Sequence, residues 1–466
     1  MKREFFTSKL FYGILMAMLA VGIAGPRLSA QEAAAENQNM AITLENRDCD
    51  RFKQQAERMA QGDVDLLMVG DSITHGWEGA GKDVWAKYYG NRKAMNFGIG
   101  GDRTGHVLWR IENSPMDKIS PKMAVVMIGT NNVGHGSSNS AQTVEGIVLI
   151  VDKLKALYPN AKILLLDVFP RDANPSGKLR QAVNEINAGL DKIYANGQVE
   201  NVKLLDINSL FLTKDGVLPA ELMPDFLHPN AAGYELWGAA VEPYIVEALG
   251  ETPRETLGED RADEWWQNRY KEKAALVEQG DIDILMVGDS ITHGWDGAGA
   301  EQWNKYYGDK KAINMGIGGD QTMHVIWRLE HYAMDKINPK AAVLLIGVNN
   351  MASGQRAQDV ALGIRRIVSI LKEKYPAIKI TVLKVFPWGN ADEKGSKQAK
   401  VDELNVAIEP MLLGFDNVQV LDLGPKFLDL KGNLTPVVMP DFLHPNAFGY
   451  DIWGNAMDAV VKEMLQ

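Results

Sequence analysis

The chain has 466 residues, enough for two or three domains that each enclose a hydrophobic core. Its composition, 46% hydrophobic and 23% charged, is that of a globular protein. The net charge of −11 argues against nucleic acid and anionic membranes as partners, because an acidic surface repels both. The single cysteine, Cys49, excludes an internal disulfide, and no zinc-type ligand cluster is visible, so we expect neither a metal nor a cofactor.

The first 30 residues differ from the rest of the chain. Three basic residues precede an apolar stretch at 10–24, and small residues at 28–30 follow it. This pattern is typical of a secretory signal peptide, and it predicts an exported protein, periplasmic or extracellular. An uncleaved membrane anchor is the alternative, which the short apolar stretch disfavours. Removal of residues 1–30 takes away four basic residues and one acid and leaves a net charge of −14, with no stable membrane insertion expected.

Four further segments follow the signal peptide. Residues 31–47 are rich in Ala, Glu, Asn and Gln and predict a flexible leader. Residues 48–249 and 261–466 are predicted to be two domains of similar length. The polar stretch 250–260 carries Pro and Gly, so we expect a linker there.

The two domains are copies of one another. The octapeptide Gly-Asp-Ser-Ile-Thr-His-Gly-Trp at 70–77 recurs letter for letter at 288–295, 218 positions later. Three further blocks recur in the same order: 95–102 with 313–320, 125–132 with 343–350, and 223–230 with 439–446. The offset is 218 for the first two of these blocks and 216 for the last. A repeat of this length indicates a duplicated domain and not a solenoid.

Within the first copy, short apolar runs alternate with longer amphipathic stretches. The runs lie at 66–69, 94–97, 124–128, 163–168 and 202–206, and stretches with helical spacing lie at 144–158, 176–196 and 230–249. Continuous apolar strands separated by helices predict an α/β fold with a parallel sheet covered on both faces. Ligands of such sheets bind beyond the carboxyl ends of the strands. Ser72, Gly101 and Asn131 each follow such an end, so we expect them to converge.

These residues and a later motif predict nucleophilic catalysis in the first domain. Ser72 needs a base, and His228 is the candidate, with Asp225 three residues earlier to hold the imidazole. The backbone N–H groups of Ser72 and Gly101 and the side-chain amide of Asn131 are the expected oxyanion donors. Together they would form a Ser-His-Asp triad with an oxyanion hole.

The second domain carries the same set. Its members are Ser290, Asp441, His444, Gly319 and Asn349. Val348 stands where the first domain has Thr130, a difference that concerns the fine geometry beside the oxyanion asparagine.

The motifs Gly-Asp-Ser, Gly-Gly-Asp, Gly-x-Asn-Asn and Asp-x-x-His, in this order in each domain, resemble the four blocks of the SGNH (GDSL) hydrolase superfamily. The strings at 96–102 and 106–110 are similar to the branch that contains the catalytic subunits of intracellular platelet-activating factor acetylhydrolase. The resemblance implies two tandem flavodoxin-like three-layer α/β/α sandwiches with parallel sheets. It also implies metal-independent serine ester hydrolysis, with the site residues in the roles given above.

The expected function is therefore that of an exported serine esterase with one site per domain. We expect short acyl groups, acetyl first, on a small-molecule or oligosaccharide ester, with acetylated carbohydrate preferred. A lysophospholipase, a thioesterase or a platelet-activating-factor-type acetylhydrolase remains open, as does a glycan-binding protein with one inactive repeat. The duplication could also form a pseudo-dimer of the two domains within one chain.

Several neighbours of the motifs have structural interpretations. Asp71 and Asp289 are expected to orient the serine turn, and Asp102 and Asp320 to brace the oxyanion loop. His75 and His293 are expected to line the turn or pocket. For Trp77 and Trp295, a place at the rim of the pocket and a place in the core are equally compatible with the sequence. The pair Trp265–Trp266 predicts packing of a helix on the sheet, with a partner-binding patch as the alternative.

Overall fold

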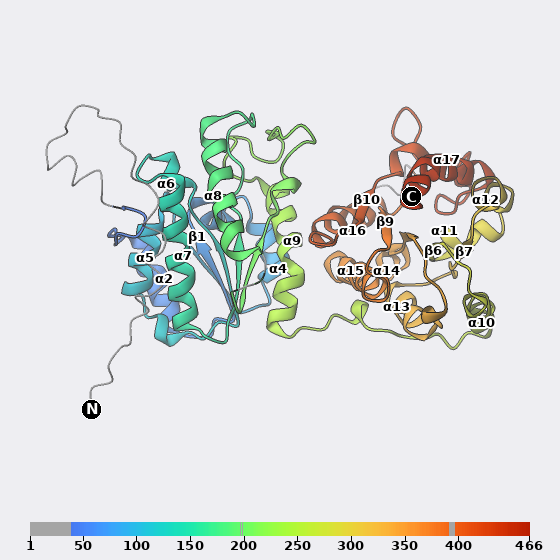
Figure 1. Cartoon of the computed structure of the whole chain (residues 1–466), viewed down its shortest axis with the longest axis horizontal. Helices are drawn as coiled ribbons and strands as arrows, with labels where there is room; N and C mark the ends of the chain where they lie inside the picture. Colours follow the sequence, from blue (N-terminus) through green and yellow to red (C-terminus); the bar gives the residue numbers. More distant parts are fainter. Residues whose placement is uncertain (1–38, 196, 198, 391–396) are drawn as a thin grey trace. The chain divides into compact units, whose positions relative to one another are not determined.

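The computed structural model describes residues 39–466 except 196, 198 and 391–396. The signal peptide expected at 1–30 lies outside the described residues. Each half of the chain folds around its own five-stranded parallel sheet flanked by helices (Figure 1). In the part of the chain that the structure describes, no helix has the length and apolar character needed to cross a membrane.

The first domain alternates strands and helices, as the sequence predicts. Its elements are α2 (Asp50–Ala60), β1 (Leu66–Gly70), α3 (Ser72–His75), α4 (Lys82–Tyr89), β2 (Ala94–Gly98), α5 (Thr104–Asn113), β3 (Met123–Met127), α6 (Thr130–Gly134), α7 (Ser140–Leu157), β4 (Lys162–Leu166), α8 (Lys178–Tyr194), β5 (Val202–Leu205) and α9 (Ala231–Leu249).

The second domain repeats this order. Its elements are α10 (Glu264–Gln279), β6 (Ile284–Gly288), α11 (Ser290–His293), α12 (Ala300–Tyr307), β7 (Ala312–Asn314), α13 (Thr322–His331), β8 (Ala341–Leu345), α14 (Val348–Ala352), α15 (Ala357–Lys374), β9 (Lys379–Leu383), α16 (Lys397–Met411), β10 (Val418–Leu421) and α17 (Ala447–Met464).

Both sheets have the same strand order. The first runs β2-β1-β3-β4-β5, and the second, read from its other edge, runs β7-β6-β8-β9-β10. This is the flavodoxin-like order, in which the direction of winding reverses between the first and third strands. A crevice opens beyond the carboxyl ends of the strands at such a reversal, and the nucleophile turns follow β1 and β6 there. The predicted fold is confirmed.

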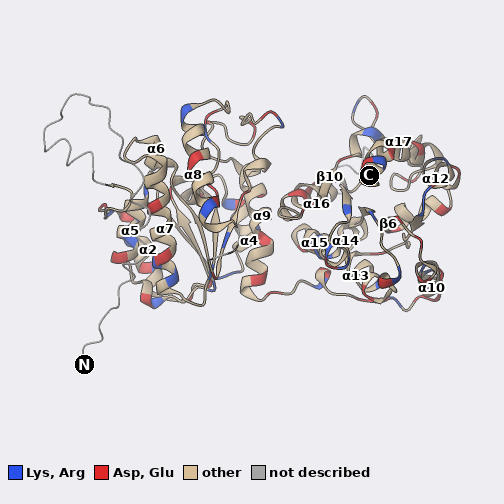
Figure 2. Cartoon of the chain, in the orientation of Figure 1, with Lys and Arg blue, Asp and Glu red and all other residues tan. Residues whose placement is uncertain are grey.

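The strands of the first sheet are buried on both faces. Leu66 and Met68 of β1 belong to one apolar cluster together with Trp237 of α9. Leu67 and Val69 point to the opposite face and belong to a second cluster, which includes residues of α5, α7 and α8. Because successive side chains of a strand point to opposite faces, a continuous apolar run supplies both clusters. Charged residues lie mostly on the helices and loops around the sheet (Figure 2).

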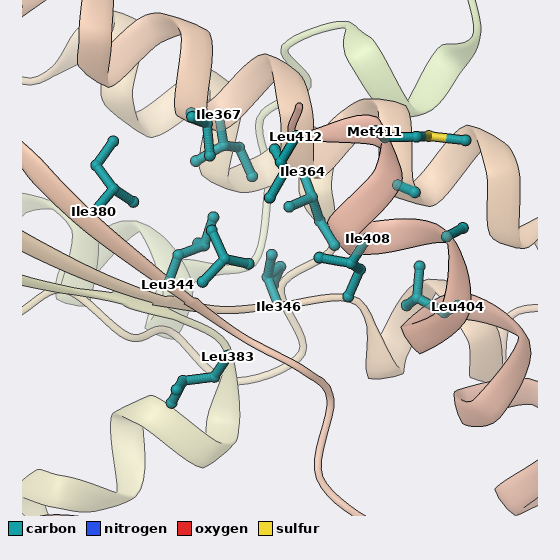
Figure 3. Close-up of a cluster of buried hydrophobic side chains, with 14 of the residues drawn as sticks. Leu344, Ile346, Ile364, Ile367, Ile380, Leu383, Leu404, Ile408, Met411 and Leu412 are labelled. Carbon is teal, nitrogen blue, oxygen red and sulfur yellow. The ribbon is translucent and has the colours of Figure 1, made fainter. Parts of the chain in front are cut away.

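The second sheet is covered in the same way. Figure 3 shows Leu344 of β8 and Ile380 of β9 among side chains from two helices. Ile364 and Ile367 come from α15, and Ile408 comes from α16. All five side chains are buried, and burial of each contributes roughly 1.5–3 kcal/mol relative to exposure. Packing alone therefore holds the helices over the sheet.

The described part of the expected leader packs on the first domain. The hydroxyl of Thr104 donates to the carbonyl of Ala41 at 2.7 Å, and the N–H of Glu45 donates to the carbonyl of Gly105 at 3.1 Å. A Cβ at Gly146 of α7 would lie 2.5 Å from the carbonyl oxygen of Ala41, so the segment approaches the helix closely. The prediction of a flexible leader is wrong for residues 40–47.

The expected linker contains the equivalent segment of the second domain. The hydroxyl of Thr322 donates to the carbonyl of Glu255 at 3.0 Å, and the N–H of Glu259 donates to the carbonyl of Met323 at 3.1 Å. Residues 255–259 therefore belong to the second domain. Local composition does not report this packing, because both segments are held in part through their backbone groups.

Candidate active site

Ser72 is the first residue of α3, directly after β1. Asp71 precedes it, and its carboxylate accepts the N–H of Ile73 at 2.9 Å, which caps the short helix. Burial raises the pKa of Asp71 to about 7, although the N–H of Ile73 opposes the shift. Asp289 caps α11 through Ile291 at 3.0 Å, and burial likewise raises its pKa to about 7. The turn-orienting role expected for both acids is confirmed.

The structure brings together the three predicted triad residues of the first domain. The Oγ of Ser72 lies 2.9 Å from Nε2 of His228, a residue 156 positions away along the chain. The other imidazole nitrogen, Nδ1, lies 2.7 Å from Oδ2 of Asp225. An imidazole held in this way can accept a proton from the serine, because its Nδ1–H is directed to the carboxylate.

The turn that carries Asp225 and His228 is built to hold the carboxylate. Its Oδ1 accepts the backbone N–H groups of Leu227 at 3.1 Å and His228 at 2.7 Å. Phe226 lies in the left-handed region, with φ +57°, which is uncommon for a side chain of this size. Partial burial would raise the pKa of Asp225, but the hydrogen bonds from His228 prevail and lower it. The carboxylate therefore stays ionised opposite the imidazole.

The second domain reproduces this geometry. Nε2 of His444 lies 2.8 Å from Oγ of Ser290, and its Nδ1 lies 2.6 Å from Oδ2 of Asp441. Phe442 has φ +59°. Partial burial acts to raise the pKa of Asp441, and the hydrogen bonds from His444 again lower it.

A buried tyrosine ties each final helix to its nucleophile turn. The hydroxyl of Tyr234, in α9, donates to the carbonyl of Ile73 at 2.6 Å. The hydroxyl of Tyr450, in α17, donates to the carbonyl of Ile291 at 2.6 Å. Because α9 and α17 begin just after the triad histidines, these bonds help to fix the histidine turn relative to the serine.

The expected oxyanion donors of the first domain lie on adjacent loops. Gly101 has φ +78°, a conformation that glycine adopts without strain. The amide nitrogen of Asn131 donates to the carbonyl of Asp102 at 3.0 Å. This bond ties the two loops together, and the second hydrogen of the amide can still donate to a ligand. Among the described residues, the backbone N–H groups of Ser72 and Gly101 have no acceptor. They are therefore available to a ligand.

The second domain has the same arrangement. Gly319 has φ +75°, and the amide nitrogen of Asn349 donates to the carbonyl of Asp320 at 2.9 Å. No acceptor in the described part of the chain takes the backbone N–H of Ser290 or Gly319.

Buried ion pairs brace the oxyanion loops, as expected for Asp102 and Asp320. Arg110 donates through Nε to Asp102 at 2.8 Å, and Arg328 donates in the same way to Asp320 at 2.9 Å. Each arginine also donates to backbone carbonyls of its sheet. This role of the two arginines was not predicted from the sequence. The signal was present in their repetition 218 positions apart.

The two oxyanion loops differ in the residues that support them besides Arg110 and Arg328. Arg47 donates through Nε to Asp102 at 2.6 Å and through Nη2 to the carbonyl of Gly100. In the second domain, the indole N–H of Trp266 donates to Asp320 at 2.6 Å. Arg261 donates to the carbonyl of Gly318 at 3.0 Å. Trp266 and Arg261 together thus make the contacts that Arg47 makes in the first domain.

The remaining aromatic and histidine expectations have mixed outcomes. Trp77 and Trp295 are fully buried, so they belong to the core and not to the pocket rim. The two residues of the pair Trp265–Trp266 have different environments: Trp266 is buried, and Trp265 is 49% exposed. His293 lies in the turn as expected, where its Nδ1 accepts the N–H of Gly318 at 3.2 Å.

A cavity of about 500 Å³ lies elsewhere in the first domain. Lys122, Lys162 and Lys203 line it, at the amino ends of β3, β4 and β5. The triad lies beyond the carboxyl ends of the strands, so this cavity is not part of the candidate site.

Known proteins are similar to the region of each domain that contains the candidate site. A sequence model of the GDSL-like Lipase/Acylhydrolase family matches residues 68–236 and 286–452. Platelet-activating factor acetylhydrolase IB subunit alpha2 of Rattus norvegicus is 38% identical over 192 residues, which are 41% of this chain and 80% of that protein. Subunit alpha1 of Bos taurus is 30% identical over 201 residues, 43% of this chain and 84% of the relative.

Solved structures align with one domain's length of the chain. A GDSL-like lipase from Bacteroides thetaiotaomicron aligns over 42% of this chain and 97% of its own, with 20% identity and a TM-score of 0.35. A carbohydrate esterase family 3 protein from Talaromyces cellulolyticus aligns over 40% and 98%, with 15% identity and a TM-score of 0.29.

Proposed function

The chain belongs to the GDSL-like lipase/acylhydrolase family, and we propose that it is an exported serine esterase with one active site in each domain. The observation that carries this proposal is the hydrogen-bonded series of hydroxyl, imidazole and carboxylate, found twice beside backbone N–H groups without acceptors. At the level of the family, the proposed activity is ester hydrolysis. The triad roles and the substrate class are the finer parts of the proposal.

In the first domain, the reaction begins when Oγ of Ser72 attacks the ester carbonyl carbon. Nε2 of His228 takes the hydroxyl proton, and Asp225 stabilises the imidazolium that forms. The N–H groups of Ser72 and Gly101 and the amide of Asn131 donate to the carbonyl oxygen as it becomes negative. His228 then gives the proton to the leaving alcohol, and a water molecule, deprotonated by the same imidazole, releases the acid from Ser72.

Ser290 and its partners perform the same steps in the second domain. Asp441 and His444 take the places of the acid and the base, and Gly319 and Asn349 supply the oxyanion donors.

We propose acetyl esters as the substrates, with acetylated carbohydrate as the class. The relatives named as acetylhydrolases support the small acyl group. The expected export of the protein supports a carbohydrate alcohol. The same relatives act, by their name, on platelet-activating factor, so an acetylated phospholipid is the second candidate.

Acetate release tests both levels of the proposal. The full chain is incubated with acetylated xylo-oligosaccharides, with an acetylated alkyl phosphocholine and with 4-nitrophenyl esters of increasing acyl length. The wild type is expected to prefer acetyl over long acyl groups, and the Ser72→Ala/Ser290→Ala variant is expected to lose turnover. Ser176→Ala, an exposed serine outside both sites, is the matched control.

Undiminished turnover by the double variant would remove the esterase proposal. Release from the phospholipid but not from the oligosaccharides would favour the second candidate. Preference for long acyl groups would favour a lysophospholipase or a thioesterase.

A further inference from the structure

One position beside the oxyanion hole differs in charge between the domains. Arg47 keeps an arginine as its counterpart, because Arg47 donates to the carbonyl of Gly100 and Arg261 donates to that of Gly318. Arg171, in the loop after β4, corresponds to Trp388 in the loop after β9. The backbone supports the second match, because the N–H of Asp172 donates to Phe226 and the N–H of Gly389 donates to Phe442. The arginine at position 171 of the first site is thus replaced by tryptophan in the second.

Arg171 stands between the oxyanion loop and the triad loop. Its Nη1 donates to the backbone carbonyl and to the hydroxyl of Thr130, both at 3.1 Å, next to the oxyanion asparagine. Burial lowers its pKa, and the carboxylates of Asp172, Asp71 and Asp225 oppose this shift. The guanidinium therefore lies within electrostatic reach of Asp225 of the triad and of Asp71, which precedes Ser72, and it remains charged at neutral pH.

The charge of Arg171 is not paired. No carboxylate of the described residues lies within ion-pairing distance of it, whereas Arg47 pairs with Asp102 and Arg110 with the same acid. Its side chain is only partly exposed, in a protein whose net charge is −11. An unpaired cation beside a catalytic centre attracts anionic ligands.

Two neighbouring positions change together with Arg171. A Cβ at Gly134 would lie 2.5 Å from Nη1 of Arg171, so glycine leaves the room that the guanidinium occupies. The second domain has Ala352 at this position. Thr130, which accepts the bond from Arg171, is replaced by Val348, which has similar volume and no acceptor. Two positions thus accommodate the guanidinium in the first site and are altered in the second, where Trp388 stands in place of Arg171.

The second site presents aromatic surface instead. A Cβ at Gly318 would lie 3.6 Å from the indole of Trp265 and 3.8 Å from Cβ of Ser290, so this exposed indole and the serine both lie close to Gly318. Trp388 packs against the apolar core of its domain and remains partly exposed.

Three apolar side chains that lie before and after the triad turn of the second domain in sequence are also exposed. Leu430, Val437 and Phe448 are exposed, and the carbonyl of Val437 accepts the amide of Asn446, two residues after His444. At the corresponding positions, with the offset of 216, the first domain has Lys214, Glu221 and Ala232.

We infer that the two active sites take different esters: the first takes esters that carry an anionic group, which Arg171 binds, and the second takes uncharged esters with an apolar or aromatic group. The inference rests on the proposed esterase function and adds the substrate class of each site. Thr130 and Gly134 are positioning residues that hold the guanidinium of Arg171 where the substrate's charge arrives.

A matched pair of acetyl esters tests the difference. In 4-acetoxybenzoate the leaving group carries a carboxylate at neutral pH, and in methyl 4-acetoxybenzoate the same group is uncharged. The full chain is used as Ser290→Ala, which leaves the first site, and as Ser72→Ala, which leaves the second. The measured quantity is the ratio of kcat/KM for the anion to kcat/KM for the methyl ester, which does not depend on the folded fraction of a variant.

The ratio is expected to be at least about 10-fold higher in the Ser290→Ala enzyme, the discrimination that one charge-assisted hydrogen bond of about 1.5–3 kcal/mol provides. Adding Arg171→Gln is expected to remove most of this difference, and Arg171→Lys to keep part of it. Lys118→Gln changes the net charge equally at the other end of the strands and is expected to leave the ratio unchanged. In the Ser72→Ala enzyme, Phe448→Ala is expected to weaken the preference for the methyl ester.

The possible results distinguish failure of the substrate assignment from failure of the proposed esterase function. Equal ratios in the two single-site enzymes, or a ratio that Arg171→Gln leaves unchanged, would overturn the assignment of different substrates while the esterase function stands. If neither enzyme hydrolyses the methyl ester, the proposed function fails and this inference fails with it.

Discussion

Ser72 and Ser290 have nearly the same surroundings. Their hydroxyl–imidazole distances are 2.9 and 2.8 Å, and the imidazole–carboxylate distances are 2.7 and 2.6 Å. The amides of Asn131 and Asn349 are both anchored to the neighbouring loop. The differences between the domains begin one residue further out, at Thr130 and Val348. We therefore propose that the two triads attack esters equally well and that the residues around them decide the substrate.

The oxyanion asparagine gives a prediction at this scale. In the Ser290→Ala background, Asn131→Ala is expected to lower kcat by about 100- to 1000-fold, because one donor to the developing anion is lost. KM is expected to change much less, since the ground-state carbonyl carries little charge. Steady-state kinetics with 4-nitrophenyl acetate measures both. Asn113→Ala, at the exposed end of α5, is the control, and an equal loss there would contradict the assignment.

The buried carboxyl of Asp71 gives a prediction on pH. Its pKa is raised from the ordinary 3.8 to about 7, and its Oδ2 has no partner among the described residues. Between these pH values the folded chain holds a proton that the unfolded chain releases, so the carboxyl's contribution to the unfolding free energy falls as pH rises. Above pH 7 the contribution of this carboxyl to the unfolding free energy no longer changes with pH.

Asp71→Asn removes this titration and keeps the oxygen that accepts the N–H of Ile73. The Tm of the variant minus that of the wild type is therefore expected to increase from pH 5 to pH 8 in calorimetry. Asp117→Asn, at an exposed acid, is expected to show no such trend. A difference in Tm that is independent of pH would contradict the buried, protonated carboxyl.

At the scale of elements, the sequence predicts the strands of the first domain closely. The apolar run at 66–69 is the strand Leu66–Gly70, and the run at 202–206 is the strand Val202–Leu205. The ends of the helices are also near their expected positions, as with 230–249 and α9 at Ala231–Leu249. Burial on both faces of the sheet makes these patterns strong, because almost every strand residue is apolar.

The same reasoning fails for segments that have neither a helix nor a strand pattern. In residues 40–47 and 255–259, carbonyl groups that accept hydrogen bonds and a close approach to glycine hold the chain on the domains. Trp266 is buried while Trp265 is exposed, and the bond from Trp266 to Asp320, 54 residues away, is a long-range contact that no local pattern reports. Likewise, the sequence leaves Trp77 open between rim and core, and only the packing with α9 places it in the core.

Gly146 tests the packing of the N-terminal segment. Gly146→Ala would bring a Cβ to 2.5 Å from the carbonyl of Ala41 and 2.6 Å from the hydroxyl of Thr104, so the segment must move away. Hydrogen exchange of the Glu45 amide is expected to become faster. Gly363→Ala is expected to have the same effect on Glu259 in the second domain. Lys155→Ala, on the same helix as Gly146, is the control. Unchanged exchange of Glu45 would show that the segment does not depend on this contact.

At the scale of the whole molecule, the duplication supplies two complete sets of catalytic groups in one chain. Both sets lie beyond the carboxyl ends of a sheet with the same strand order, where the direction of winding reverses. The two sets keep the same donors and acceptors, while the flanking residues differ in charge and polarity. Under the proposed function, duplication allows one chemistry to act on two kinds of ester.

The central claim is that Ser72 and Ser290 are both nucleophiles, and covalent labelling tests it most directly. A fluorophosphonate forms a stable bond with an activated serine, and intact-mass measurement counts the adducts. The wild type and Ser176→Ala are expected to carry two adducts per chain, Ser72→Ala and Ser290→Ala one each, and the double variant none. Two adducts on the double variant, or none on the wild type, would contradict the claim.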